Sequence, residues 1–337
     1  MGKEAVLLLA HGTPETVEQI PEYLRNVVSG RPLPQHVVEE IQHRYSLIGR
    51  SPLTEITQEQ GRLVEAELAA RGQTAPVYVG MRNWRPYIPD VVRQMRADGV
   101  EEAAVICLAP QNSRTSVGLY RRAVQAEAGA LRIDFTDGWA QHPLLAEAFA
   151  ERLRVTMAKL TAETGAPVPV LFTAHSVPSR TVQPSTASEG QPRLWPGEGA
   201  DPYAEEAKHT AELVAARVDG IPRWWFAFQS QGASGGPWIG PSVEETLDAV
   251  AASGVRILIL QPVGFLCDHV EILYDVDILF HGYAAKLGVR LERPESLNAS
   301  QTLAKAVADL ARQGLERLRL QAEIPGDPDS SQPFVLE

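Results

Sequence analysis

Residues 169–178 read PVLFTAHSVP. An uninterrupted apolar run ends at His175, and Pro178 stops its continuation. Apolar runs that do not alternate with polar residues are typical of parallel strands that are covered by helices on both faces. The sequence therefore predicts a buried parallel strand here, and similar strands wherever such runs recur, at residues 5–10, 76–81, 103–110, 224–229 and 256–265.

Helical patterns separate these runs. Apolar residues recur at helical spacing in residues 51–72, 87–99, 142–160 and 242–254. The first two of these segments end at a glycine, as helices commonly do. An alternation of strand and helix is typical of a doubly wound α/β fold.

The chain of 337 residues is longer than one hydrophobic core usually supports, which is about 250–300 residues. We therefore expect two α/β lobes, each a parallel sheet flanked by helices, at residues 1–165 and 166–289. A C-terminal helix at about 290–322 is expected to pack back on the first lobe. Residues 179–199 lack periodicity and are either a lid or an insertion, and the tail 323–337 is expected to be disordered.

Composition excludes several classes of protein. A formal net charge of −11 argues against the basic face that nucleic-acid binding needs. No stretch approaches the roughly 20 apolar residues of a membrane span, and the N-terminal apolar run is short for a secretory signal. The two cysteines, Cys107 and Cys267, cannot hold an iron–sulfur cluster. We expect a cytoplasmic protein with reduced cysteines.

Polar residues follow several of the predicted strands. Ligands of open α/β sheets bind outside the carboxyl ends of the strands. His175 and His11 stand at such ends, as do the polar turns at 110–113 and 229–232. Any one of these residues could simply satisfy the backbone of its loop, but together they indicate a binding crevice.

A row of acids occupies residues 268–278, DHVEILYDVDI. In a helix, Glu271 and Asp275 share one face, among apolar residues where a buried face is expected. Asp268 has a simpler explanation, because an acid at a helix N-terminus interacts favourably with the helix dipole. Carboxylates together with imidazole suit iron, zinc or a similar ion better than magnesium.

The segments AHSVP, DPY, FQSQG, PVGF and DH.E.LYD.D, in this order, resemble the ferrochelatase family, lyases of haem biosynthesis that insert ferrous iron into a porphyrin. The resemblance implies two Rossmann-like lobes that face a porphyrin cleft. Ferrous iron and porphyrin are then the substrates, and no permanently bound cofactor is expected. A transient contact with the next enzyme of the haem pathway is also implied.

HGTP, GRPLP and RYSLIG are most similar to the branch that acts on coproporphyrin III and makes iron-coproporphyrin III. Three alternatives stay open: a protoporphyrin IX ferrochelatase, a chelatase for another tetrapyrrole, and a haem- or porphyrin-binding carrier without turnover. A dinucleotide oxidoreductase is disfavoured, because HGTPE stands where G-x-G-x-x-G would follow the first strand.

The resemblance assigns roles to individual residues. His175 and Glu271 match the iron site and the proton acceptor of the family, and Asp275 is an outer acid. His11 stands where the coproporphyrin branch often has a tyrosine, so it is either an axial ligand of the porphyrin iron or a hydrogen-bonding residue at a strand end. Leu279 replaces a further acid of some relatives.

A second group of residues is implied to contact the carboxylates of the porphyrin. Arg44, Tyr45 and Ser51 belong to RYSLIGRSPL, and Tyr120 to SVGLYRRA. An arginine pairs well with a carboxylate because the contact can be bidentate. The coproporphyrin branch has an arginine where this chain has Val28, and Arg31 could replace it.

Overall fold

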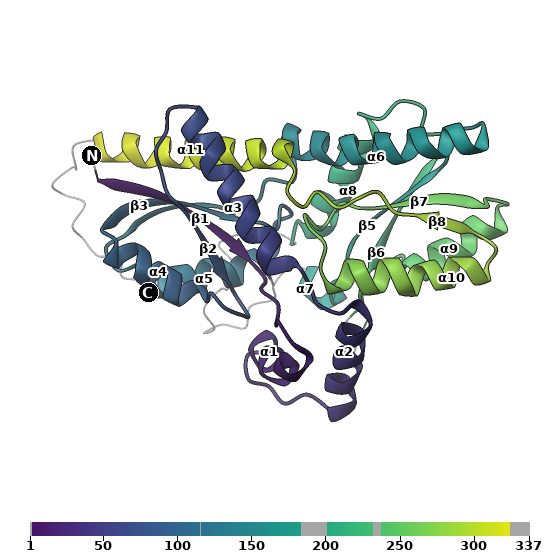
Figure 1. Ribbon diagram of the computed structural model, residues 1–337, viewed down its shortest axis with the longest axis horizontal. Helices are drawn as coiled ribbons and strands as arrows, with labels where there is room; N and C mark the ends of the chain where they lie inside the picture. The colour runs from purple at the N-terminus through teal and green to yellow at the C-terminus, as the bar shows by residue number, and fades with distance from the viewer. Residues whose placement is uncertain (1, 115, 183–200, 232–236, 324–337) are drawn as a thin grey trace.

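The computed structural model describes residues 2–114, 116–182, 201–231 and 237–323. It contains two four-stranded parallel sheets, with strand orders β2-β1-β3-β4 and β6-β5-β7-β8 (Figure 1). The predicted class, two lobes each with a parallel sheet flanked by helices, is confirmed. The strands are β1 (Lys3–Ala10), β2 (Val77–Met81), β3 (Val100–Cys107), β4 (Arg132–Thr136), β5 (Val170–His175), β6 (Trp224–Gln229), β7 (Ile257–Pro262) and β8 (Arg290–Glu292).

Helices connect the strands and cover both sheets (Figure 1). Most are α-helices, but η1 is a 3-10 helix and η2 is a π-helix of ten residues. The helices are η1 (Val17–Gln19), α1 (Ile20–Val27), α2 (Gln35–Ile48), α3 (Leu53–Ala70), α4 (Ile88–Ala97), α5 (Val117–Ala128), α6 (Pro143–Thr164), α7 (Ser179–Val182), α8 (Tyr203–Ala215), α9 (Val243–Ala252), η2 (Glu271–Phe280), α10 (His281–Lys286) and α11 (Gln301–Glu323).

Each sheet is the middle layer of a three-layer lobe. In the first lobe, α3 and α11 cover one face and α4 and α5 cover the other (Figure 1). In the second, α6 and α8 lie on one face and α9, η2 and α10 on the other. Because both faces are covered, the central strands β1 and β5 are almost wholly buried, as their continuous apolar sequences predict.

The two long helices cross between the lobes, which corrects the predicted boundaries. α6 was expected in the first lobe, but it packs on α8 and the second sheet. α11 begins at Gln301, not near residue 290, because residues 290–292 form β8 of the second sheet. The apolar stripe of a helix shows that one face is buried. It does not show which of the two sheets that face covers.

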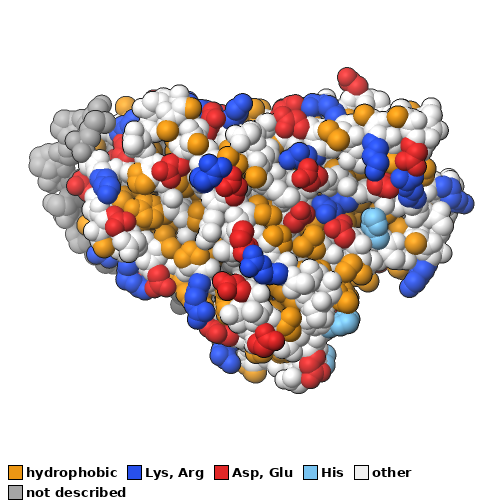
Figure 2. Space-filling view, viewed as in Figure 1, with side chains coloured by type: hydrophobic (Ala, Val, Ile, Leu, Met, Phe, Trp, Pro, Cys, Tyr) orange, Lys and Arg blue, Asp and Glu red, His pale blue; other side chains and the backbone are white. Residues whose placement is uncertain are grey.

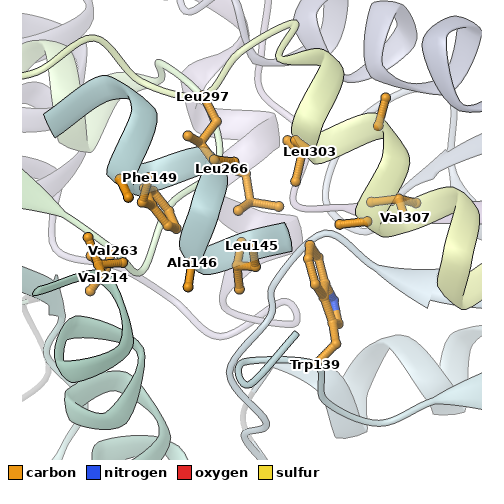
Figure 3. Packing of buried hydrophobic residues seen from close by; sticks show 14 of the residues in the cluster. Trp139, Leu145, Ala146, Phe149, Val214, Val263, Leu266, Leu297, Leu303 and Val307 are labelled. Carbon is orange, nitrogen blue, oxygen red and sulfur yellow. The ribbon is translucent and has the colours of Figure 1, made fainter. Parts of the chain in front are cut away.

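One hydrophobic cluster runs through both lobes. It joins Leu145, Ala146 and Phe149 of α6 to Leu303 and Val307 of α11 (Figure 3). The indole of Trp139 lies beside these residues and donates a hydrogen bond of 2.8 Å to the Cys107 carbonyl at the end of β3. The two lobes therefore share one hydrophobic cluster.

Two of the predicted features fall largely outside the described residues. Of the segment 179–199, only α7 is described, and residues 183–199 are not. Nor are residues 324–337 of the tail described. None of the described helices is long and apolar enough to cross a membrane. On the face shown in Figure 2, acidic and basic side chains are interspersed.

Candidate active site

A cavity of about 300 Å³ lies between the lobes, where the carboxyl ends of β1, β3 and β5 meet. Both lobes contribute to its walls. Its polar and charged lining residues are His11, Thr13, Tyr23, Tyr45, Ser51, Thr57, Gln60, Arg82, Gln111, Ser113, Ser116, Tyr120, His175, Tyr203, His269 and Glu271. Apolar lining comes from residues such as Leu53, Leu108, Val177, Phe265 and Val270.

Two glycines let the backbone pass close to the histidines of the cavity. Gly12, next to His11, has φ +83°, and a Cβ there would lie 2.9 Å from the Trp84 nitrogen. A Cβ on Gly264 would lie 2.9 Å from the Cβ of Ala174, the residue before His175. Both contacts are too short for any side chain, so each glycine is required by the local packing.

Glu271 lies between two imidazoles. Its Oε1 is 3.2 Å from Nε2 of His175, and its Oε2 is 3.2 Å from Nε2 of His269. His175 ends β5, whereas Glu271 is the first residue of η2 and His269 lies two residues before it. About 30% of the His175 side chain and 31% of the Glu271 side chain are exposed, so both are accessible from the cavity.

The other nitrogen of each ring is held by the backbone. Nδ1 of His175 donates a hydrogen bond to the Ser176 carbonyl, and Nδ1 of His269 donates to the Cys267 carbonyl at 3.0 Å. A proton fixed on Nδ1 leaves Nε2 as the nitrogen that gains or loses a proton or binds a metal. Both reactive nitrogens are therefore directed at the same carboxylate.

The negative charge of Glu271 and the positive charge of a protonated His175 stabilise each other. Burial lowers the pKa of His175, but the Glu271 carboxylate, the Ser176 carbonyl and Asp275 together outweigh it, so the pKa lies above its usual value. Burial raises the pKa of Glu271, yet His175 and His269 together hold it well below its usual range. Glu271 is thus a carboxylate at neutral pH, and it stabilises a proton on His175.

The part of the cavity wall that comes from the first lobe holds a neutral histidine. Burial, aided by the positive charge of Arg82, lowers the pKa of His11 to about 3. The side-chain amide of Asn83 lies 3.1 Å from Nε2, and the ring of Tyr23 meets the imidazole edge-on at 6.1 Å. His11 therefore presents an uncharged imidazole to the cavity.

Asp275 lies one turn beyond Glu271 but lines a different, second cavity of about 540 Å³. Its carboxylate accepts hydrogen bonds from the Ser230 hydroxyl and from Nη1 of Arg44, the latter at 3.2 Å. Burial raises the pKa of Asp275 to about 6, although Ser230 and Arg44 act to lower it. Leu279 lines the same second cavity.

The residues implied to bind carboxylates divide into two groups. Tyr45, Ser51 and Tyr120 are buried and line the main cavity. Among the described residues the Ser51 hydroxyl has no hydrogen-bond partner, whereas the Tyr45 hydroxyl contacts the Thr13 hydroxyl at 2.9 Å.

Arg44 and Arg31 do not line the main cavity. Arg44 pairs with Asp275 and Glu40, and its guanidinium lies 5.0 Å from the centre of the Tyr274 ring. Arg31 is exposed and bonds the Val28 carbonyl at 3.0 Å.

Several residues that line the main cavity were not selected from the sequence, among them His269, Arg82 and Gln111. His269 stands two residues before Glu271, and the pattern H-x-E in a segment already chosen was an available signal. Arg82 directly follows the predicted strand 76–81, and its guanidinium lies 5.3 Å from the centre of the Tyr120 ring. Gln111 lies in a polar turn that was noted, and it bonds the Val263 carbonyl of the other lobe at 3.1 Å. Within the described ranges, no group of three or more His, Cys, Asp or Glu side chains is arranged to hold a metal ion.

Comparison with known proteins identifies the family. The family model described as Ferrochelatase matches residues 3–315. A ferrochelatase from Acidobacterium capsulatum is 61% identical over 98% of this chain and 99% of its own length. A coproporphyrin III ferrochelatase from Mycolicibacterium vanbaalenii is 36% identical over 95% and 91%, respectively.

Among solved structures, a sirohydrochlorin chelatase from Bacillus subtilis subspecies spizizenii, in complex with cobalt, has a similar fold. The TM-score is 0.56 at 11% identity, over 95% of this chain and 98% of that chain. The solved structure shows only a similar fold. Because the family model matches almost the whole chain and both relatives are ferrochelatases, this chain belongs to the ferrochelatase family.

Proposed function

We propose that this ferrochelatase inserts ferrous iron into coproporphyrin III, and that His175 and Glu271 lie at the point of insertion. The observation that carries the proposal is the Glu271 carboxylate held at 3.2 Å from Nε2 of both His175 and His269. This group faces a cavity between the lobes.

The chemistry needs a base at this place. Insertion of Fe²⁺ forms bonds to four pyrrole nitrogens and releases two N–H protons, so a nearby group must accept protons. Neutral His175 can accept one proton at a time at Nε2, and the adjacent Glu271 carboxylate stabilises the imidazolium that forms. Because part of its side chain is exposed, His175 can release the first proton to solvent before it takes the second. The same nitrogen, when unprotonated, can bind the incoming iron with Glu271 before the porphyrin takes it.

His11 would act from the other side of the ring. Its low pKa keeps the imidazole neutral throughout the physiological range, which is the form that ligates iron. We propose that it binds the iron axially, on the face of the macrocycle away from His175. The alternative role, a hydrogen bond at the strand end, is supported by its contact with Asn83.

The assignment of coproporphyrin III rests on groups that can bind carboxylates. Ser51 and Arg82 both line the cavity, and the buried Ser51 hydroxyl has no partner within the part of the chain that the structure describes. Arg44 would have to exchange Asp275 for a substrate carboxylate, since those two residues are paired here. Relatives named as coproporphyrin III ferrochelatases are 33–36% identical to this chain.

Protoporphyrin IX is the second candidate substrate. Its two vinyl groups would suit the apolar lining from Leu53, Leu108 and Val177. The 61% identical relative is named only as a ferrochelatase, which leaves both substrates open.

The two substrates are separated by a parallel insertion assay. Coproporphyrin III and protoporphyrin IX are incubated anaerobically with Fe²⁺ and the enzyme, and the loss of free-porphyrin fluorescence is followed. One additional charge-assisted hydrogen bond to a propionate predicts a preference of roughly tenfold in kcat/KM for coproporphyrin III. A preference for protoporphyrin IX would overturn the substrate assignment and keep the reaction. Turnover of neither, with firm porphyrin binding, would contradict the proposed roles of His175 and Glu271.

A further inference from the structure

The connection between β8 and α11 packs against the segment that carries the histidine–glutamate group. Arg293, Ser296 and Asn298 of this connection all bond to acids that flank Glu271. None of these three residues lines the main cavity. Their role is therefore one of support.

Arg293 contacts both sides of the Glu271 segment. Its Nε and Nη2 bond the two carboxylate oxygens of Asp277 at 2.6 and 2.8 Å, and its Nη1 lies 3.3 Å from Oδ1 of Asp268. Asp268 is three residues before Glu271, and Asp277 is six residues after it. One guanidinium, with only 14% of its side chain exposed, thus ties together the two ends of the stretch.

Asp268 is fully engaged in this network. Its carboxylate accepts hydrogen bonds from Ser296 Oγ at 2.7 Å and from Asn298 Nδ2 at 2.9 Å, while its backbone N–H donates to Asn298 Oδ1 at 2.8 Å. The Asn298 carbonyl in turn accepts from Nε2 of Gln60, a lining residue of the cavity, at 2.9 Å. The connection therefore links the wall of one lobe to the acid-bearing helix of the other.

The helix itself explains why such support is needed. η2 is a π-helix over ten residues, whereas π-helical hydrogen bonding in proteins is mostly limited to a single turn. A conformation that is intrinsically unfavourable persists only where surrounding contacts determine it. A change in its winding would rotate Glu271 away from His175.

We propose that Arg293 is a positioning residue for iron insertion, which holds Glu271 in contact with His175 and His269 by tying Asp268 to Asp277. The inference rests on the proposed role of Glu271 in the reaction.

The test compares Arg293→Met with Arg290→Met in the full chain. Arg290 lies in β8, three residues before Arg293, and bonds the exposed Glu163 and the half-buried Glu292, so it controls for loss of an arginine ion pair close to the connection. Loss of a residue that supports a metal ligand predicts an insertion rate that is about 10–100-fold lower for Arg293→Met, with the porphyrin Kd unchanged. Arg290→Met should change either quantity by no more than about twofold. A normal insertion rate in Arg293→Met would overturn the inference.

A double variant separates positioning from general damage. If Arg293 acts through Glu271, Arg293→Met adds no further loss to a Glu271→Gln enzyme, whereas multiplicative losses would contradict the proposal. If Arg293→Met fails to fold, Asp277→Asn keeps the shape of the contact and gives the same comparison. Normal insertion by Glu271→Gln alone would instead overturn the proposed function.

Discussion

His11 and His175 occupy corresponding places in the two lobes and have opposite properties. Each stands at the carboxyl end of the strand that is second in its sheet order, β1 in one lobe and β5 in the other. The pKa of His11 is lowered to about 3 by burial, with Arg82 acting in the same direction, while that of His175 is raised by Glu271 against the effect of burial. Topology places a histidine at the end of each strand, and the balance between burial and charged neighbours decides its protonation state.

The difference gives the cavity two unlike walls. The His175 wall holds a carboxylate and two imidazoles that can exchange protons. On the His11 wall the imidazole is neutral, the ring of Tyr23 meets it edge-on, and the charge of Arg82 acts on it. Under the proposed function, a porphyrin between the walls would meet proton-accepting groups on the His175 side and a neutral imidazole on the His11 side.

Removal of the base, His175, should have the largest effect on the rate of iron insertion. His175→Ala is expected to lower the rate of iron insertion by about 1,000-fold or more, because it removes both the base and a metal ligand. The measurement is anaerobic porphyrin fluorescence, with circular dichroism to show that the fold is kept. His209→Ala changes an exposed histidine on α8 and should insert iron normally. Rapid insertion by His175→Ala would remove His175 from the reaction.

Neutralising the acid should have the next largest effect. Glu271→Gln keeps the size of the side chain but removes the charge that raises the pKa of His175. We expect a rate reduced by about 100-fold. Because His175 must lose its proton to act as a base, the acidic limb of the pH–rate profile should also move to lower pH. Glu205→Gln, on the exposed face of α8, is the control. An unmoved limb would show that Glu271 does not set the pKa of His175.

The sequence predicted which strand ends meet in the site better than it predicted which side chains contact one another there. His11 and His175 could be assigned to one crevice because the carboxyl ends of parallel strands share an edge. The short strands β4 and β8 were missed, since RIDFT and RLE lack a long apolar run. The Arg44–Asp275 pair was not predicted either, because it joins residues 231 positions apart.

Changing His11 should alter the product more than the rate. His11→Ala is expected to keep the insertion rate within about tenfold, because the base and the acid on the other wall are intact. The absorption spectrum of iron-porphyrin bound to the enzyme should change, since an axial nitrogen ligand is lost. His43→Ala, on an exposed position of α2, serves as the matched variant. An identical spectrum would favour the hydrogen-bonding role of His11.

The smallest expected effect is on stability. In the folded protein the pKa of His11 lies at about 3, below the value of about 6.5 for an unfolded histidine, so the unfolded state binds the extra proton as the pH falls. Its contribution is therefore complete above pH 6.5 and decreases below it. Between pH 7.5 and 5, the wild type should lose roughly 1–2 kcal/mol more unfolding free energy than His11→Gln. Urea unfolding at both pH values measures this difference, and equal losses would mean that His11 is protonated in the folded protein.

The exchange of long helices between the lobes limits how this enzyme can be divided. α6 covers the second sheet although it precedes all strands of that sheet, and α11 returns to the first sheet after the last strand. After a cut at residue 165, the N-terminal half would keep α6, which covers the second sheet, and would lack α11. The C-terminal half would keep α11, which covers the first sheet, and would lack α6. Lobes of two relatives could be recombined only as three pieces, joined before Pro143 and again before Gln301. A single cut between the sheets therefore cannot separate the lobes as independent units.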